Sequence, residues 1–190
     1  ALVTLWERAK RPARGGVIPA AWRRPLAGGA ITVVVVGTVL YALAFTGIYL
    51  RPVTRIAASR WIYQNIPRGA TITFEYWDDP LPVPLDGLWP PNEYQQVQME
   101  LYWEDVPEKR ERLIEWLDQA EYIIMSSNRL YGSIPRLPDR FPMTTRYYEA
   151  LFSGELGYDP LISFTSRPRI LGIELVDDNA DESFTVYDHP

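Results

Sequence analysis

AGGAITVVVVGTVLYALAFTGIYL, residues Ala27–Leu50, contains twenty-four residues and no charged side chain. As an α-helix rising about 1.5 Å per residue it measures roughly 36 Å, which exceeds the thickness of a bilayer's hydrocarbon core, about 30 Å. A core helix of a soluble protein seldom runs so far without a charge, and the apolar run is longer than the roughly 7–15 residues typical of a signal peptide. The stretch predicts one transmembrane helix over residues 26–50.

The charges on the two sides of this stretch differ in sign. Residues 1–50 carry six Lys or Arg and one acidic residue, whereas residues 51–190 carry 13 basic and 23 acidic residues, a net charge of −10. Flanks rich in Lys and Arg stay in the cytoplasm. We therefore predict a single-pass plasma membrane protein with a basic cytoplasmic arm (1–25) and an acidic extracytoplasmic domain (51–190). Such a domain is a poor partner for nucleic acid, which is bound through neutralisation of its phosphates.

The residue inventory excludes several kinds of catalytic and metal site. The chain has no cysteine, so disulfides, thiolate metal sites and cysteine nucleophiles are excluded. Its single histidine, His189, lies next to the last residue, which argues against a histidine metal cluster or a Ser–His–Asp triad within the domain. No metal site and no cofactor is predicted.

After the span, segments whose apolar residues have the spacing of a strand alternate with segments whose apolar residues have the spacing of a helix. Because the two types interleave, we predict one mixed α/β domain of about five or six strands and three helices. Asp105 is the expected N-cap of the central helix, whose predicted buried stripe is Leu113, Ile114 and Leu117. The expected helices cover residues 53–65, 105–120 and 144–153, and the expected strands cover 70–77, 95–103, 122–125, 161–166, 170–176 and 183–187.

Two irregular stretches, 78–91 and 126–141, hold several of the candidate binding residues. Asp78 and Asp79 directly follow a predicted strand, where carboxylates could bind a divalent cation or act as a base. The alternative is a solvated turn before Pro80, and it is the more common use of such residues. Five aromatic side chains could form a platform that packs against the apolar face of a sugar, although aromatic side chains more often fill a core. This aromatic set is Trp77, Trp89, Tyr94, Trp103 and Tyr131.

Three arginines in the second irregular stretch could clamp a phosphate or a carboxylate. The alternative is that they pair with the surplus acids of the domain. These arginines are Arg129, Arg136 and Arg140. The chain has no P-loop, nucleophile elbow or dinucleotide-binding glycine pattern.

Three stretches together resemble a known family: AASRWIYQNIPRGATITFEYWDDPLP (57–82), SSNRLYGSIPRLPDRFPMTTRYYEALFSGELGY (126–158) and ADESFTVYDHP (180–190). They resemble the C-terminal membrane span plus extracytoplasmic domain of bacterial glycosyltransferases of the dolichyl-phosphate-mannose–protein mannosyltransferase-like class, in the C-type superfamily. The resemblance implies transfer of a sugar from a lipid-phosphate carrier, with the catalytic acid in a loop that this chain does not contain. The chain is then expected to be a fragment that is inactive alone, and its domain would cover the active site or hold an acceptor.

Two functions follow as predictions. The first is the anchored, non-catalytic tail domain of such an enzyme, in contact with the lipid bilayer and with a glycan or lipid-linked sugar. The second is a non-catalytic, single-span accessory subunit of a larger bacterial respiratory or photosynthetic membrane complex. Small residues in the span would let a helix of another subunit approach closely. These candidate docking residues are Gly28, Gly29, Gly37 and Gly47.

Overall fold

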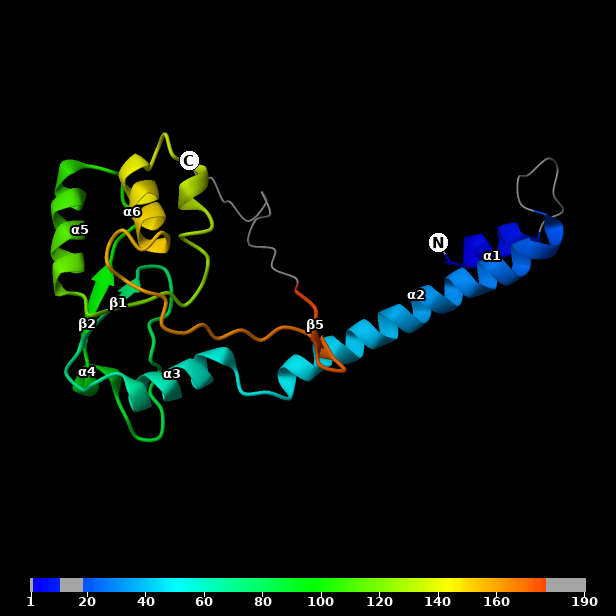
Figure 1. The fold of residues 1–190 in the computed structure, drawn as a ribbon, viewed down its shortest axis with the longest axis horizontal. Coiled ribbons are helices and arrows are strands. Elements are labelled where there is room, and N and C mark those ends of the chain that lie inside the picture. Colours follow the sequence, from blue (N-terminus) through cyan, green and yellow to red (C-terminus); the bar gives the residue numbers. More distant parts are fainter. Residues whose placement is uncertain (1, 11–18, 177–190) are drawn as a thin grey trace. The chain divides into compact units, whose positions relative to one another are not determined.

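The computed structural model describes residues 2–10 and 19–176, and the chain divides into two compact units (Figure 1). The first unit contains residues up to Arg51 together with Arg167–Val176. The second unit contains Pro52–Ser166. The predicted strand over 183–187 lies outside the described residues.

The first unit is built on one long helix. Helix α2 (Ala20–Tyr49) packs against the short helix α1 (Leu2–Lys10) near Gly28, whose Cα faces the ring of Trp6. Strands β4 (Arg169–Ile170) and β5 (Ile173–Glu174) form an antiparallel hairpin, and β4 packs against α2.

Among the described residues, one helical stretch, Ala21–Asn65, contains a segment long and apolar enough to cross a membrane. The apolar segment lies in α2, and the helix is interrupted at Arg51–Pro52, where proline removes a backbone donor. Almost all side chains of α2 are exposed, as expected of a helix surrounded by lipid rather than by a protein core. This candidate membrane helix lies near the N-terminus of the chain, and not in the C-terminal position that the resemblance assigns to it.

The second unit contains a three-stranded parallel sheet. Its strand order is β2-β1-β3, with β1 (Thr71–Glu75) in the centre, β2 (Gln95–Met99) on one side and β3 (Tyr122–Ile124) on the other. Thr73 lies opposite Val97 and Ile123, which fixes the register of all three strands. The remaining elements are α3 (Thr54–Asn65), α4 (Pro90–Glu93), α5 (Pro107–Gln119), the 3₁₀ helix η1 (Ile134–Arg136) and α6 (Pro142–Phe152).

Two apolar clusters cover the two faces of this sheet. One joins Ile72 to Ile62 of α3 and to Tyr94, whose hydroxyl donates to the Ile62 carbonyl at 3.1 Å. The other joins Met99 of β2 to Trp116 of α5 and to residues of α6. Successive strand side chains alternate between faces, so Ile72 lies on the α3 side and Glu75 faces the cluster of α5 and α6.

The predicted fold class is wrong in its count and arrangement of strands. Among the described residues only three strands form the sheet of the α/β unit, and four α-helices accompany it. Residues 161–166 form no strand, because no sheet edge pairs with them. Residues 170–176 form no single strand either, since Leu171 and Gly172 have φ of 49° and 85° and reverse the chain.

Candidate functional site

The candidate site lies where the strands β1 and β3 end. In a parallel sheet the carboxyl ends of all strands lie at one edge. Ligands of open α/β sheets bind at this edge, between two neighbouring strands whose following connections run to opposite sides of the sheet. The connection that follows β1 leads to β2 on one side of it, whereas β3 is the neighbour of β1 on the other side. Residues 76–79 and 125–129 therefore meet at this carboxyl edge.

Hydrogen bonds join the two segments at the carboxyl edge. The Ser127 hydroxyl donates to Asp78 Oδ2 at 2.6 Å, and the Arg129 guanidinium donates to the Trp77 carbonyl at 2.9 Å. The Ser126 hydroxyl donates to the Asp79 carbonyl at 3.1 Å. Three of the residues predicted as binding residues, Trp77, Asp78 and Arg129, are thus brought together.

Trp77 is held in an uncommon backbone conformation at this edge. Its φ is 82°, a region that bulky residues seldom occupy and that costs on the order of 1–3 kcal/mol. Its side chain is 57% exposed, and its ring makes edge contacts with Tyr76 and Tyr102 at 5.2 and 6.3 Å between centroids. Strained backbone of this kind gathers at ligand sites, where the surrounding contacts enforce it.

The adjacent acids Asp78 and Asp79 do not act as a pair. Asp78 accepts the hydrogen bond from Ser127, whereas the carboxylate of Asp79 is 87% exposed and lies 3.5 Å from Arg55 of α3. Within residues 2–10 and 19–176, no group of three or more acidic or histidine side chains is placed to hold a metal ion. The arrangement can accept hydrogen bonds from a polar ligand.

The other predicted binding residues lie away from this edge or within the core. Trp89 precedes α4 at the amino edge of the sheet, where the amide of Gly69 donates to the carbonyl of Glu93 at 2.6 Å. Tyr131 packs its ring against Phe152 at 5.4 Å between centroids, and Arg136 belongs to η1. Trp77 and Trp89, two members of the predicted aromatic platform, are therefore not brought together.

A buried carboxyl group lies directly below the carboxyl edge, and the sequence did not single it out. Glu75, the last residue of β1, is 2% exposed; its Oε1 accepts a hydrogen bond from the Tyr148 hydroxyl at 2.8 Å, while its Oε2 has no partner. Burial raises the pKa of Glu75 to about 7; the hydrogen bond from Tyr148 opposes this rise and the charge of Asp78 adds to it. The signal in the sequence was the position of Glu75 within the alternating strand, two residues after the buried Thr73.

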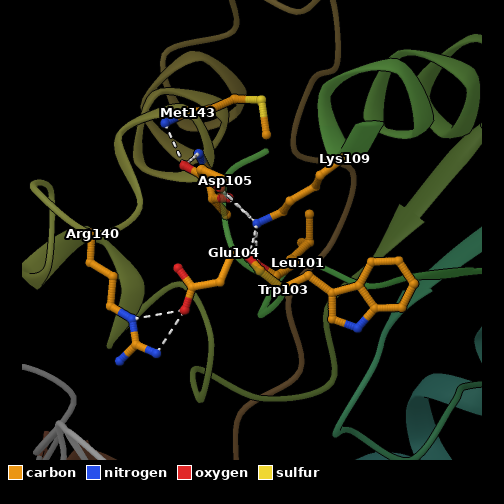
Figure 2. Close-up of polar contacts among 8 residues, drawn as sticks. Leu101, Trp103, Glu104, Asp105, Lys109, Arg140 and Met143 are labelled. Atoms are coloured by element: carbon orange, nitrogen blue, oxygen red, sulfur yellow. Dashed lines mark hydrogen bonds and ion pairs between the residues drawn. The ribbon is translucent and has the colours of Figure 1, made fainter. Parts of the chain in front are cut away.

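A second buried charge cluster has a different character (Figure 2). Lys109 is 1% exposed, and its ammonium group donates to the carbonyls of Leu101 and Trp103, to Asp105 Oδ1 and to the Thr144 hydroxyl at 2.6–2.8 Å. Four acceptors surround three N–H groups, so the ammonium is fully satisfied. Burial lowers the pKa of Lys109, and the hydrogen bond to Asp105 opposes the shift.

Asp105 in this cluster caps a helix, but not the helix predicted. Residue Val106 is the N-cap of α5, whereas Asp105 Oδ2 accepts from the amides of Met143 and Thr144 at 2.7 and 3.0 Å, in the first turn of α6. Burial acts to raise the pKa of Asp105, but its hydrogen bonds to Lys109 and Thr144 outweigh burial and lower it. This cluster joins α5 to α6 and leaves no group for a ligand.

Two further sequence expectations change in the structure. Ile114, expected in the buried stripe of α5, is 55% exposed, while Lys109, Leu113 and Trp116 are buried instead. Ile114 lines a shallow groove between α5 and the segment Leu156–Tyr158, which none of the predicted binding residues line. Arg140, grouped with Arg129 in the sequence, pairs with Glu104 at 2.9 Å.

The glycines predicted to dock another helix are spread over the whole of α2. Gly28 faces α1, and Gly47 accepts a hydrogen bond at its carbonyl from Arg51. At Gly29 and Gly37 an added Cβ would meet nothing within 4 Å.

Comparison of the chain with protein-family models, with curated proteins and with solved structures finds no match to any of them.

Proposed function

We propose that the chain is the membrane-anchored domain of a glycosyltransferase that uses a lipid-linked sugar, and that its α/β unit binds a sugar without carrying out the transfer. Helix α2 supports the anchor, because it combines sufficient length with an exposed apolar surface. The basic arm lies in the cytoplasm and the acidic α/β unit outside the plasma membrane, in keeping with the charge asymmetry.

The observation that carries the sugar-binding proposal is the exposed ring of Trp77 at the carboxyl edge. The apolar face of a sugar ring packs on such a ring, and the carboxylates of Asp78 and Asp79 accept hydrogen bonds from sugar hydroxyls. Arg129 fixes the Trp77 carbonyl and Ser127 fixes Asp78, so the groups are held in place before a ligand arrives.

The test is the affinity of the full chain in lipid nanodiscs for a soluble probe, methyl α-mannoside, measured by saturation-transfer NMR. Trp77→Ala should weaken binding about tenfold, which corresponds to ~1.4 kcal/mol. Trp89→Ala is the matched control, because Trp89 is 53% exposed against 57% for Trp77 but lies at the opposite edge of the sheet. Equal losses in both variants, or no saturable binding of the probe, would refute the sugar site.

Orientation is tested with a membrane-impermeant maleimide, since the chain contains no cysteine of its own. Glu108→Cys, on the exposed surface of α5, should react in intact spheroplasts, whereas Arg14→Cys in the basic arm should react only after lysis. The reverse pattern would show that the basic arm is outside.

A second candidate function is the accessory subunit that docks on a larger membrane complex. The observation in its favour is the open space beside Gly29 and Gly37 on α2. Co-purification from native membranes separates the two candidates: a stoichiometric complex that Gly37→Leu dissociates and the control Val36→Leu leaves intact supports docking. A native protein much larger than 22 kDa with further spans supports the glycosyltransferase.

A further inference from the structure

The hairpin Arg169–Glu174 has an unusual residue at its tip. Arg169 lies opposite Glu174 and Ile170 opposite Ile173, so Leu171 and Gly172 alone make the turn. Both have positive φ, 49° and 85°, which defines a type I′ turn. That turn favours Asn, Asp or Gly at its first central position, and leucine is disfavoured there.

Leucine at this tip is unfavourable in water for a second reason. The side chain of Leu171 is 97% exposed, and those of Ile173 and Val176 are each 65% exposed. Single exposed apolar residues are common on soluble proteins, but here Leu171 and Ile173 belong to one short hairpin and Val176 follows it directly. A residue that suits neither the turn nor water indicates that the tip has an apolar environment.

The hairpin belongs to the same unit as the candidate membrane helix, against which β4 packs (Figure 1). The Arg51 guanidinium donates to the carbonyls of Arg167 and Gly47, which fastens the hairpin to the last turn of α2. The side chain of Ala44 in α2 is only 2% exposed, although most side chains of this helix are exposed.

This end of α2 has the features of a membrane–water interface. Tyr41, Phe45 and Tyr49 are spaced four residues apart and form a ladder of ring contacts, with centroids separated by 6.4 and 5.9 Å. Aromatic side chains gather at the headgroup level of transmembrane helices. From Arg24 to Tyr49 the helix rises about 37 Å, enough for the hydrocarbon core and part of the headgroup layer.

The charges around the hairpin complement lipid headgroups. Arg169 forms an ion pair with Glu174, and the hydrogen bond from Arg169 lowers the pKa of Glu174; Arg167 and Arg51 act in the same direction. The guanidinium groups of Arg51 and Arg169 and the carboxylate of Glu174 together carry a net charge of +1 beside the end of α2. Guanidinium groups bind phosphate in a fork geometry, and the headgroup layer is rich in phosphate.

We propose that the Arg169–Glu174 hairpin is a second membrane contact, in which Leu171 and Ile173 enter the boundary between headgroups and acyl chains beside α2. The arginines at its base bind lipid phosphates. This inference rests on the proposed role of α2 as the membrane anchor. Because Arg51 is followed by Pro52 and Ser166 is followed by Arg167, both ends of the α/β unit are then attached to the bilayer surface, rather than one.

The experiment uses the full chain in nanodiscs. Because the chain contains no cysteine, each introduced cysteine carries the only label of its variant. A bimane dye is placed at Leu171→Cys, at Val35→Cys in α2, or at Ile114→Cys on α5, and is quenched by doxyl lipids or by aqueous iodide. Val35 is 47% and Ile114 55% exposed, so both labels are accommodated at the surface.

The expected result is that lipid quenches the dye at positions 35 and 171, and that iodide quenches it at position 114. If the dye at position 35 is quenched by lipid but the dye at position 171 responds only to iodide, the hairpin contact is refuted and the anchor stands. If the dye at position 35 responds only to iodide, the anchor itself fails, and the hairpin contact with it.

A second variant separates membrane insertion from hairpin folding. Leu171→Asn suits the positive φ of the turn, so the hairpin is kept while its apolar tip is removed. With the dye at Ile173→Cys, this change should reduce lipid quenching to the level of position 114; unchanged quenching refutes the role of Leu171. Anionic lipid should strengthen quenching relative to zwitterionic lipid, and this gain should vanish in Arg169→Gln. A gain unaffected by Arg169→Gln would refute the role of that arginine.

Discussion

Replacement of Glu75 by glutamine should remove most of the pH dependence of stability of the α/β unit. The carboxyl group is 2% exposed, and only one of its oxygens has a partner, the Tyr148 hydroxyl. Burial raises its pKa to about 7, against an ordinary value of 4.5, although the hydrogen bond from Tyr148 opposes the rise. Glutamine keeps the shape and the acceptor oxygen but cannot ionise.

The magnitude follows from proton linkage. A carboxyl group whose pKa is raised on folding binds its proton more tightly in the folded state, so the folded state is favoured at low pH. The rise in the pKa of Glu75 from 4.5 to about 7 corresponds to a contribution of roughly 3 kcal/mol to the free energy of unfolding. This contribution is fully present below about pH 4.5, declines as the pH rises through 7, and is absent above it.

The assay is urea unfolding of the full chain in detergent micelles, followed by tryptophan fluorescence at about pH 5 and about pH 8. The unmodified chain should lose roughly 2.5 kcal/mol of unfolding free energy between the two, and Glu75→Gln should lose much less. Glu111→Gln, which removes an exposed carboxylate of α5, is the control and should behave like the unmodified chain. Equal pH dependence in Glu75→Gln and the unmodified chain would show that Glu75 ionises at its ordinary pKa and that the reasoning is wrong.

Three further outcomes are expected from the same unfolding assay. Asp105→Ala should cost about 3–5 kcal/mol, because it leaves the buried ammonium of Lys109 without its counterion. Glu104→Ala should cost less than about 1 kcal/mol, since its pair with Arg140 is exposed; a cost equal to that of Asp105→Ala would contradict this ranking. Gly154→Ala should cost about 1–2 kcal/mol, because the φ of 80° after α6 disfavours a Cβ, and an unchanged midpoint would count against that conformation.

The span and the helices α3, α5 and α6 were predictable because their signals are local. The charge-free stretch of α2 and the spacing of Leu113 with Leu117 in α5 depend only on neighbours along the chain. Residues 54–65 follow for the same reason. Ile114 shows the limit of this reasoning. Apolar character alone predicts Ile114 on the buried face of α5, whereas that face contains Lys109, which has helical spacing to Leu113 and Trp116.

The strands were less predictable because pairing depends on distant partners. Residues 161–166 have the composition of a strand, but no sheet edge pairs with them. In residues 170–176, Gly172 permits the positive φ of a turn. Leu171 is not a residue typical of such a turn, so the local sequence does not predict one.

The candidate site could be predicted only in part for the same reason. The position of Asp78 after a strand and that of Arg129 in a loop predict both as binding residues, but their proximity depends on β1 and β3 being neighbours, which no local pattern reveals. Trp89 and Trp77 are predicted to share one aromatic platform, but the segment between them separates the two rings. That segment returns the chain to the amino edge of the sheet, where β2 has to begin in order to run parallel to β1.

The buried groups around Lys109 and the buried carboxyl group of Glu75 differ in how many of their hydrogen-bonding atoms have partners. This difference indicates a structural role for the first and a functional role for the second. Every N–H of Lys109 has an acceptor, and both oxygens of Asp105 accept hydrogen bonds, so that cluster can gain nothing from a ligand or a proton. Glu75 keeps one oxygen unpaired beneath the edge where Trp77 and Asp78 lie. A buried carboxylate charge is costly, and protonation removes that charge, so the raised pKa favours the neutral form. A ligand that binds the carboxylate form of this edge must therefore release a proton near neutral pH, so its affinity should rise with pH through the pKa of Glu75.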